Sequence, residues 1–370
     1  CYGVGKFVMG TISDRSDARK FMALGLLLTA LCNFAFGGVA NAKLHMFLWA
    51  LNGFFQGMGW PPCGRSMGHW FSVRERGVFF STWNTSHNLG GGLAGILAAY
   101  VAGLWGWQAA FFVPGILAVI GSAYLFMRLR DTPQSVGLPP IEEYRDDFTE
   151  EELQHGLRED ELGTRELLID YVLTNKYIWL LAVANFFAYI ARYSMLDWGP
   201  MYLREVKEAT LAGGGFAILV IEFGGIPSTI FFGWVSDKVA GRRGLVSTLC
   251  MVPIAGAFAV IAVTPPGYLW LDMSMLAVIG CFIYPVINLI TIAALDLTSK
   301  KAIGAAAGFI GLFGYIGRTV QAKGFGWMVD YFKEVYSLQT AWLIVMYTIV
   351  ACAVVAIIML ATMWRLKPKA

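Results

Sequence analysis

The stretch Gly10-Thr-Ile-Ser-Asp-Arg15 returns later in the chain as Gly233-Trp-Val-Ser-Asp-Lys238, 223 residues further on. A basic turn before Gly77 likewise returns before Gly304, 227 residues further on. Two features that recur at nearly the same shift indicate an internal repeat, in which each copy forms one structural unit. We therefore expect two similar halves in one chain.

Composition predicts that both halves lie in a membrane. Of the 370 residues, 57% are hydrophobic and 14% are charged, whereas soluble domains carry about 25% charged residues. A disulfide-stabilised secreted domain is excluded, because the six cysteines stand singly in apolar runs without CxxC spacing. The formal charge of +3 is too small to indicate a nucleic-acid partner.

Long apolar runs define the predicted helices, since a spanning helix needs about 20 mostly apolar residues. The runs are 1–12 (partial), 21–40, 46–71, 78–104, 108–127, 176–203, 213–235, 245–264, 268–296, 302–329 and 340–363. We expect an all-α, multi-pass protein with two pseudo-symmetric six-helix bundles, at 1–127 and 176–370, joined by a linker at 128–175. The second bundle has six runs, so we expect the first to lack its first helix and part of its second.

The basic residues of the short loops predict the orientation. If loops alternate sides, one side carries thirteen of them: Arg15, Arg19, Lys20, Arg74, Arg76, Lys238, Arg242, Arg243, Lys300, Lys301, Arg365, Lys367 and Lys369. The other side carries four: Lys43, Arg204, Lys207 and Lys333. Loops rich in Lys and Arg stay on the cytoplasmic side, which places the linker and the C-terminus in the cytoplasm. Ten acidic residues lie between Glu142 and Glu161, and we interpret this run as a solvated linker rather than a regulatory site.

Three basic residues lie inside the apolar runs. Lys6 stands eight residues before Asp14, which places it about 12 Å into the membrane, and His87 and Arg192 each lie about 15 Å from a helix end. The hydrocarbon core is about 30 Å thick, so all three are predicted near its midplane. Charges at this depth serve a function as a rule, and this set predicts an anion site.

Each of these residues also has a structural alternative. Arg192 could form an ion pair with Asp197 or Glu222, and His87 could be a packing histidine. Trp83 and Asn84 lie one turn before His87 and would add hydrogen-bond donors on its face of the helix.

Further candidates extend the site. Arg318 and Lys323 on the penultimate helix could enlarge the anion site, although Lys323 could instead snorkel to the interface. Five aromatic residues inside helices could pack or could line a route for a sugar or glycerol moiety: Tyr2, Trp60, Tyr189, Tyr284 and Tyr315. The glycines at 308, 311, 314 and 317 and at 90–92 predict close helix packing.

The repeated stretches also place charges at helix ends. These residues are Asp14, Arg15, Asp237 and Lys238. We expect them to hold neighbouring helices together in one state of a conformational cycle.

The repeated Gly-x-x-Ser-Asp-Arg stretch resembles the loop of the major facilitator superfamily. Within it, the chain resembles the organophosphate:inorganic phosphate antiporters, and the resemblance covers nearly the whole chain. The stretches that carry it are Gly57-Met-Gly-Trp-Pro-Pro-Cys-Gly64, Arg74-Glu-Arg-Gly77, Trp83-Asn-Thr-Ser-His-Asn-Leu-Gly-Gly-Gly92, Asp131-Thr-Pro-Gln-Ser135, Gly137-Leu-Pro-Pro-Ile-Glu-Glu143 and Arg192 to Trp198.

The resemblance implies a phosphate site made by two arginines, a lysine and a histidine. Arg192, Lys6 and His87 match three of these, and the first-helix arginine would fall before residue 1. The resemblance also places on the substrate pathway Tyr2, Trp60, Trp83, Asn84, Tyr189, Tyr284 and Tyr315. Lys323 matches a lysine of the hexose-phosphate members, but Thr319 stands where they have aspartate, and other stretches favour the glycerol-3-phosphate branch.

The expected function is therefore exchange of a phosphate ester, glycerol-3-phosphate or hexose-6-phosphate, for inorganic phosphate by alternating access. A membrane sensor of the same fold is the alternative. An enzyme is not expected, since the sequence has no HExxH, Ser/His/Asp or Cys/His arrangement. We expect no cofactor, no metal and no nucleic acid, and a monomer in the lipid bilayer of a bacterial inner membrane.

Overall fold

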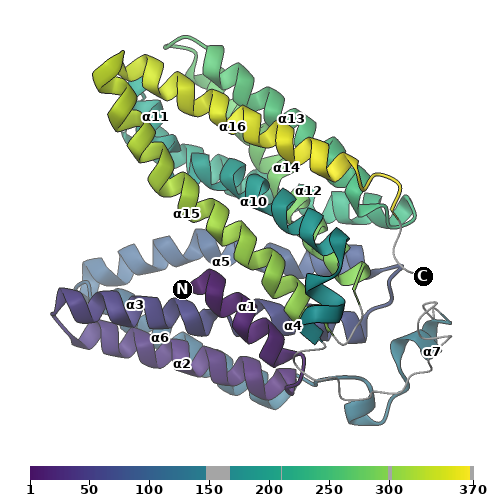
Figure 1. Ribbon diagram of the computed structural model, residues 1–370. Coiled ribbons are helices and arrows are strands. Elements are labelled where there is room, and N and C mark those ends of the chain that lie inside the picture. The colour runs from purple at the N-terminus through teal and green to yellow at the C-terminus, as the bar shows by residue number, and fades with distance from the viewer. Residues whose placement is uncertain (147–166, 210, 299–301, 367–370) are drawn as a thin grey trace.

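The structure is a computed structural model that describes residues 1–146, 167–209, 211–298 and 302–366. Across these residues the chain is all-α, without strands, as the sequence predicts. Two helical bundles lie side by side, one from the first part of the chain and one from the second (Figure 1). Most of the acidic run of the linker falls at 147–166 and so lies outside the described residues.

The first bundle consists of six helices. They are α1 (Tyr2–Ser13), α2 (Ala18–Gly38), α3 (Ala42–Gln56), α4 (Trp60–Trp70), α5 (Arg76–Trp105) and α6 (Ala109–Arg128). The prediction of one helix over 46–71 is wrong, because the turn Gly57-Met-Gly59 separates α3 from α4. Pro61 and Pro62 then begin α4, where the missing N–H groups of proline need no helical partner.

In its described residues, the segment between the bundles forms three short elements. These are a 3-10 turn (Gln134–Val136), α7 (Ile141–Arg145) and a π-helical segment (Leu167–Leu173).

The second bundle begins at α10 (Lys176–Asp197). It continues with α11 (Gly199–Val206), α12 (Leu211–Lys238), α13 (Arg243–Val263), α14 (Leu269–Asp296), α15 (Ile303–Val335) and α16 (Leu338–Ala361). The predicted helix 176–203 is broken at Trp198, just before Pro200, and the predicted helix 302–329 extends to Val335. Nine of the helices in the described part of the chain are long and apolar enough to cross a membrane.

The bundles differ in how well they are buried. Trp342, Phe258 and Met251 lie fully buried in the second bundle, whereas Ile96 and Tyr100 on α5 are 65% and 66% exposed. A Cβ atom added to Gly90 or Gly91 would meet nothing within 4 Å. The expectation of close packing is therefore wrong for these two glycines.

The bundles contact each other closely at one end, which we call the closed end: residues 10–18, 68–81, 233–243, 288–298 and 302–308. Here α1 packs on α15 and α5 packs on α12. Toward the other end of the molecule the ribbons of the two bundles move apart (Figure 1). A Cβ on Gly10 would clash with the carbonyl oxygen of Gly304, and one on Gly308 would lie 2.6 Å from the carbonyl oxygen of Lys6. Only glycine permits this backbone approach.

Candidate functional site

A pocket of about 520 Å³, including space open to solvent, lies between the bundles. Both bundles line it: Tyr2 and Lys6 from α1, Trp60 from α4, Asn84 and His87 from α5, Tyr189, Arg192 and Tyr193 from α10, Tyr284, Ile287, Asn288 and Thr291 from α14, and Tyr315 from α15. None of these thirteen residues is acidic. The pocket therefore has the electrostatic character of an anion site.

Lys6 reaches the pocket along a narrow path beside α15. A Cβ on Gly311 would lie 2.6 Å from Cδ of Lys6, so the glycine leaves room for the lysine stem. The ammonium nitrogen sits 4.4 Å from the centroid of the Trp60 ring. Lys6 is buried, and its contact with the ring is a cation–π interaction that partly replaces lost hydration.

Arg192 lies across the pocket on α10. Its guanidinium stands 4.6 Å from the ring centroid of Tyr284 and 5.1 Å from that of Tyr193, and its Nε has no hydrogen-bond partner. Glu222 is near enough for its charge to act on Arg192, but the two form no ion pair among the described contacts. A buried guanidinium with a free N–H is suited to bind an anion.

Asp197 does not pair with Arg192. It accepts hydrogen bonds from Arg318 at 3.1 Å and from Gln321 at 2.8 Å. Arg318 also lies 4.0 Å from the ring centroid of Tyr193, and it does not line the pocket.

The three basic groups act on one another. The positive charge of Arg192 is felt at Lys6, and the charges of Arg192 and Lys6 are felt at His87. His87 is exposed at the pocket wall, whereas Lys6 and Arg192 are 6% and 7% exposed. The like charges of Lys6 and Arg192, from opposite bundles, repel without a bound anion, and the arrangement favours an anion that bridges them.

Aromatic rings join the two bundles beside these charges. Tyr2 stands edge-on to Tyr315 at a centroid distance of 4.6 Å, and Tyr315 contacts Tyr189 at 5.5 Å. The sequence candidates Tyr2, Tyr189, Tyr284, Tyr315, Trp60 and Asn84 thus come together around Lys6, His87 and Arg192.

Two other candidates lie outside the pocket lining. Trp83 packs on Trp60 at 5.9 Å rather than facing the pocket, and Lys323 is exposed on α15.

Sequence reasoning missed four lining residues: Tyr193, Ile287, Asn288 and Thr291. Three of them follow Tyr284 at helical spacing, three, four and seven residues on, and so share its face of α14. That periodicity is the signal that could have found them.

At the closed end, Asp14 contacts the opposite bundle. Its two carboxylate oxygens accept hydrogen bonds from the backbone N–H groups of Gly304 at 2.6 Å and Ala305 at 2.7 Å. These N–H groups belong to the first turn of α15, where no helical acceptor exists. Burial raises the pKa of the Asp14 carboxyl to about 7, although the two N–H groups oppose the rise.

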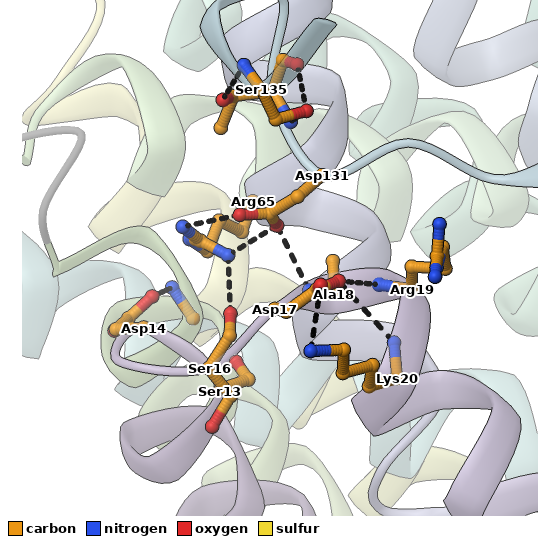
Figure 2. A network of polar contacts seen from close by, with 12 residues as sticks. Ser13, Asp14, Ser16, Asp17, Ala18, Arg19, Lys20, Arg65, Asp131 and Ser135 are labelled. Atoms are coloured by element: carbon orange, nitrogen blue, oxygen red, sulfur yellow. Dashed lines mark hydrogen bonds and ion pairs between the residues drawn. The ribbon is translucent and has the colours of Figure 1, made fainter. Parts of the chain in front are cut away.

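The loop that carries Asp14 is held by its own bundle (Figure 2). Arg65 pairs with Asp131 at 2.7 Å and donates to the carbonyl oxygen of Ser16 at 2.6 Å. Asp131 in turn accepts from the backbone N–H of Ala18 at 2.8 Å. This network, which the sequence did not reveal, fixes the position of Asp14.

Asp237 makes the corresponding contact in the second copy. It accepts from the backbone N–H of Val78, in the first turn of α5, at 2.9 Å. It also pairs with Arg243, whose Nε binds Asp296 at 3.1 Å. Asp296 reaches Arg76 of the first bundle at 3.0 Å, and this buried cluster was not expected. Of the basic residues that follow the two aspartates, Lys238 lies over the Trp234 ring of its own helix, and Arg15 is exposed.

The chain matches the family described as Major Facilitator Superfamily over residues 1–322. It is 42% identical to a glycerol-3-phosphate transporter of Bacillus subtilis (strain 168), over all of this chain and 82% of the relative. It is 40% identical to a probable hexose phosphate transport protein of Chlamydia pneumoniae, over all of this chain and 81% of the relative. It is 38% identical to the membrane sensor protein UhpC of Salmonella typhimurium (strain LT2), over 90% and 75%.

Among solved structures, the fucose:proton symporter FucP of E. coli matches with a TM-score of 0.73 at 12% identity, over 99% of this chain and 89% of that one. At this identity the match shows a shared fold. It agrees with the all-α, two-bundle architecture described above.

Proposed function

Since the chain belongs to the Major Facilitator Superfamily and, within it, to the organophosphate:phosphate antiporter family, we propose that it exchanges a phosphate ester for inorganic phosphate across a membrane. The observation that carries this proposal is the pocket, in which Lys6, His87 and Arg192 from both bundles surround one space without an acidic lining residue. The superfamily consists of transporters rather than enzymes. Within the described residues, no cluster of His, Cys, Asp and Glu is placed to hold a metal ion.

The mechanism follows from the repulsion among the basic groups. Arg192 belongs to the second bundle, and Lys6 and His87 belong to the first. An empty pocket opposes their approach, whereas a phosphate dianion bound between them offsets the repulsion. The carrier therefore reorients with an anion bound, and exchange of one anion for another follows by alternating access. A protonated His87 adds a positive charge that favours a bound phosphate dianion, whereas a neutral His87 does not.

We propose that the closed end faces the cytoplasm. Six of the thirteen loop basic residues belong to the segments of this end, and cytoplasmic loops are enriched in Lys and Arg: Arg15, Arg74, Arg76, Lys238, Arg242 and Arg243. The described state would then receive its substrate from outside a bacterial inner membrane. Both bundles of one chain line the pocket, which supports a functional monomer.

The two relatives with transporter names set the substrate class. Glycerol-3-phosphate and hexose phosphates share the phosphate group, for which the basic pocket is suited. Lys323, the residue that resembles the hexose-phosphate members, lies outside the pocket lining. This placement favours glycerol-3-phosphate.

Exchange of labelled inorganic phosphate in proteoliposomes tests the proposal with the full-length protein. We expect Arg192→Lys to reduce exchange by about 10²-fold, because lysine cannot replace the planar, bidentate fork. Arg318→Lys is the matched control, since Arg318 pairs with Asp197 outside the pocket lining; it should retain most activity. If the Arg192→Lys variant exchanged phosphate at the rate of the wild type, the proposal would be overturned.

The sensor relative supports a second candidate, a receptor that binds the ester without turning it over. The same proteoliposomes separate the two. A sensor would bind labelled ester in the purified state, yet it would show neither phosphate exchange nor counterflow.

A further inference from the structure

Asn288 connects the pocket to the opposite bundle. Its Nδ2 donates a hydrogen bond of 2.7 Å to Oγ of Ser81 on α5, and both residues are buried. Asn288 also lines the pocket, one turn beyond Tyr284 on the same face of α14. The side chain therefore lies at the contact between the bundles and at the pocket wall.

The other end of the amide has no protein partner. Oδ1 of Asn288 is inaccessible to solvent and accepts no hydrogen bond from the protein. The residue as a whole is 2% exposed. Buried acceptors are almost always paired, because leaving one unpaired costs free energy. An acceptor left without a partner beside a pocket is therefore suited to a ligand donor.

The chemistry of this acceptor separates it from the basic groups. An amide oxygen accepts hydrogen bonds only, so it repels the negative oxygens of a phosphate group and attracts an O–H group. Thr291, one turn further along α14, adds a hydroxyl to the same pocket wall. A phosphate bound at Lys6 and Arg192 would direct the rest of an ester toward other parts of the lining.

We propose that Oδ1 of Asn288 accepts a hydrogen bond from a carbon-borne hydroxyl of the transported ester and so selects hydroxylated esters. This inference rests on the proposed function. Inorganic phosphate has no carbon-borne hydroxyl, so Asn288 contributes to recognition of the ester and not of the counter-substrate.

The test compares competitors of phosphate self-exchange in proteoliposomes with the full-length protein. The probes are glycerol-3-phosphate, glucose-6-phosphate and n-propyl phosphate, the last of which has the phosphate but no carbon-borne hydroxyl. Of glycerol-3-phosphate and glucose-6-phosphate, the one that competes better should be preferred by the wild type over n-propyl phosphate by about tenfold or more. The reason is that a site built to bind a hydroxyl rejects an analogue without it. Asn288→Leu, nearly equal in size, should reduce that preference to about threefold or less, measured as the ratio of inhibition by the two esters.

Ser81→Ala is the matched control. It removes the hydrogen bond between the bundles and leaves the acceptor of Asn288 in place, so the preference should remain. Asn288→Ser is the second variant, used if the leucine variant does not fold, and it should also lose the preference because its short side chain withdraws the acceptor from the pocket.

Three outcomes would overturn the inference: an unchanged preference in both Asn288 variants, an equal loss for all three competitors and phosphate, or an equal loss of preference in Ser81→Ala. Failure of the proposed function would look different, since the wild type itself would then lack phosphate exchange. Equilibrium binding of the same three esters to the purified protein would in that case still decide the role of Asn288.

Discussion

The two copies of the Gly-x-x-Ser-Asp stretch make the same contact with the opposite bundle, yet they are stabilised differently. Gly10 touches Gly304 while Asp14 binds the first turn of α15. Gly233 touches Gly77 and Ser81 while Asp237 binds the first turn of α5 at Val78. The contact geometry thus follows the internal repeat.

The charges around the two copies do not repeat. Asp14 rests on backbone N–H groups, and the Arg65–Asp131 pair that positions its loop stays within the first bundle. Asp237 belongs to a cluster in which Asp296 joins Arg243 of its own bundle to Arg76 of the other. The first copy is therefore held by backbone N–H groups at a helix end, and the second is held in addition by buried charged side chains. The following substitutions distinguish these two kinds of contact.

The largest effect on stability is expected at Asp296, at the centre of the charged cluster around the second copy. Asp296→Asn leaves Arg76 and Arg243 buried without their shared carboxylate, which costs about 3–5 kcal/mol of unfolding free energy. Denaturant unfolding of the protein in detergent measures it. Asp330→Asn, which breaks an exposed pair with Lys333, is the control; equal stabilities for the two variants would refute the ionic role.

Glycine replacements come next and should affect both copies alike. Gly10→Ala and Gly233→Ala each insert a methyl group where the bundles touch, at a cost of about 1–3 kcal/mol. Gly90→Ala is the matched control, because nothing lies within 4 Å of its added Cβ. Unfolding curves of the three variants test this; a neutral result at Gly10 and Gly233 would contradict the close approach.

A pH-dependent effect is also expected for the first copy. Since burial raises the pKa of Asp14 to about 7 in the closed contact, that contact binds a proton more strongly than a solvated carboxylate does. Acidification from pH 7 toward pH 4 therefore shifts the equilibrium between the open and the closed contact toward the closed one, by a factor approaching tenfold per pH unit. Above pH 7 this carboxyl causes no further change in the equilibrium.

Spin-label distances between the bundles at several pH values measure this equilibrium. Asp14→Asn should flatten the pH dependence, and Asp237→Asn should leave the part due to Asp14 in place. A pH dependence that persists unchanged in Asp14→Asn would assign it to another group.

The smallest effects are expected at the basic residues that follow each aspartate. Arg15 is exposed, and Lys238 stacks on Trp234 of its own helix. Arg15→Ala and Lys238→Ala should each change stability by less than about 1 kcal/mol. A loss as large as that of Asp296→Asn would show that these charges, too, hold the bundles together.

Sequence reasoning reached those features that depend on counting along the chain. Helical rise places Lys6, His87 and Arg192 at one depth, and the structure brings them to one pocket. The repeat predicts two bundles, and two are present.

Features that depend on distant pairing were missed. Arg76 and Asp296 are 220 residues apart, and Ser81 and Asn288 are 207 apart. No local pattern marks such partners, because each residue alone looks like an ordinary polar group at a helix end or on a helix face. The break at Gly57–Gly59 was missed for the converse reason, since membrane helices tolerate glycine and proline.

The glycine contact between α1 and α15 has a consequence for speed. Interlocked side chains must lift out of one another before two helices can separate, and each such repacking adds to the activation barrier. Where Gly10 and Gly308 bring backbone against backbone, there are few side chains to disengage. We therefore expect the surface around these two glycines to add little to the barrier, so that the rate of opening depends on the polar contacts of the closed end and on the aromatic contacts between α1 and α15, such as Tyr2 with Tyr315.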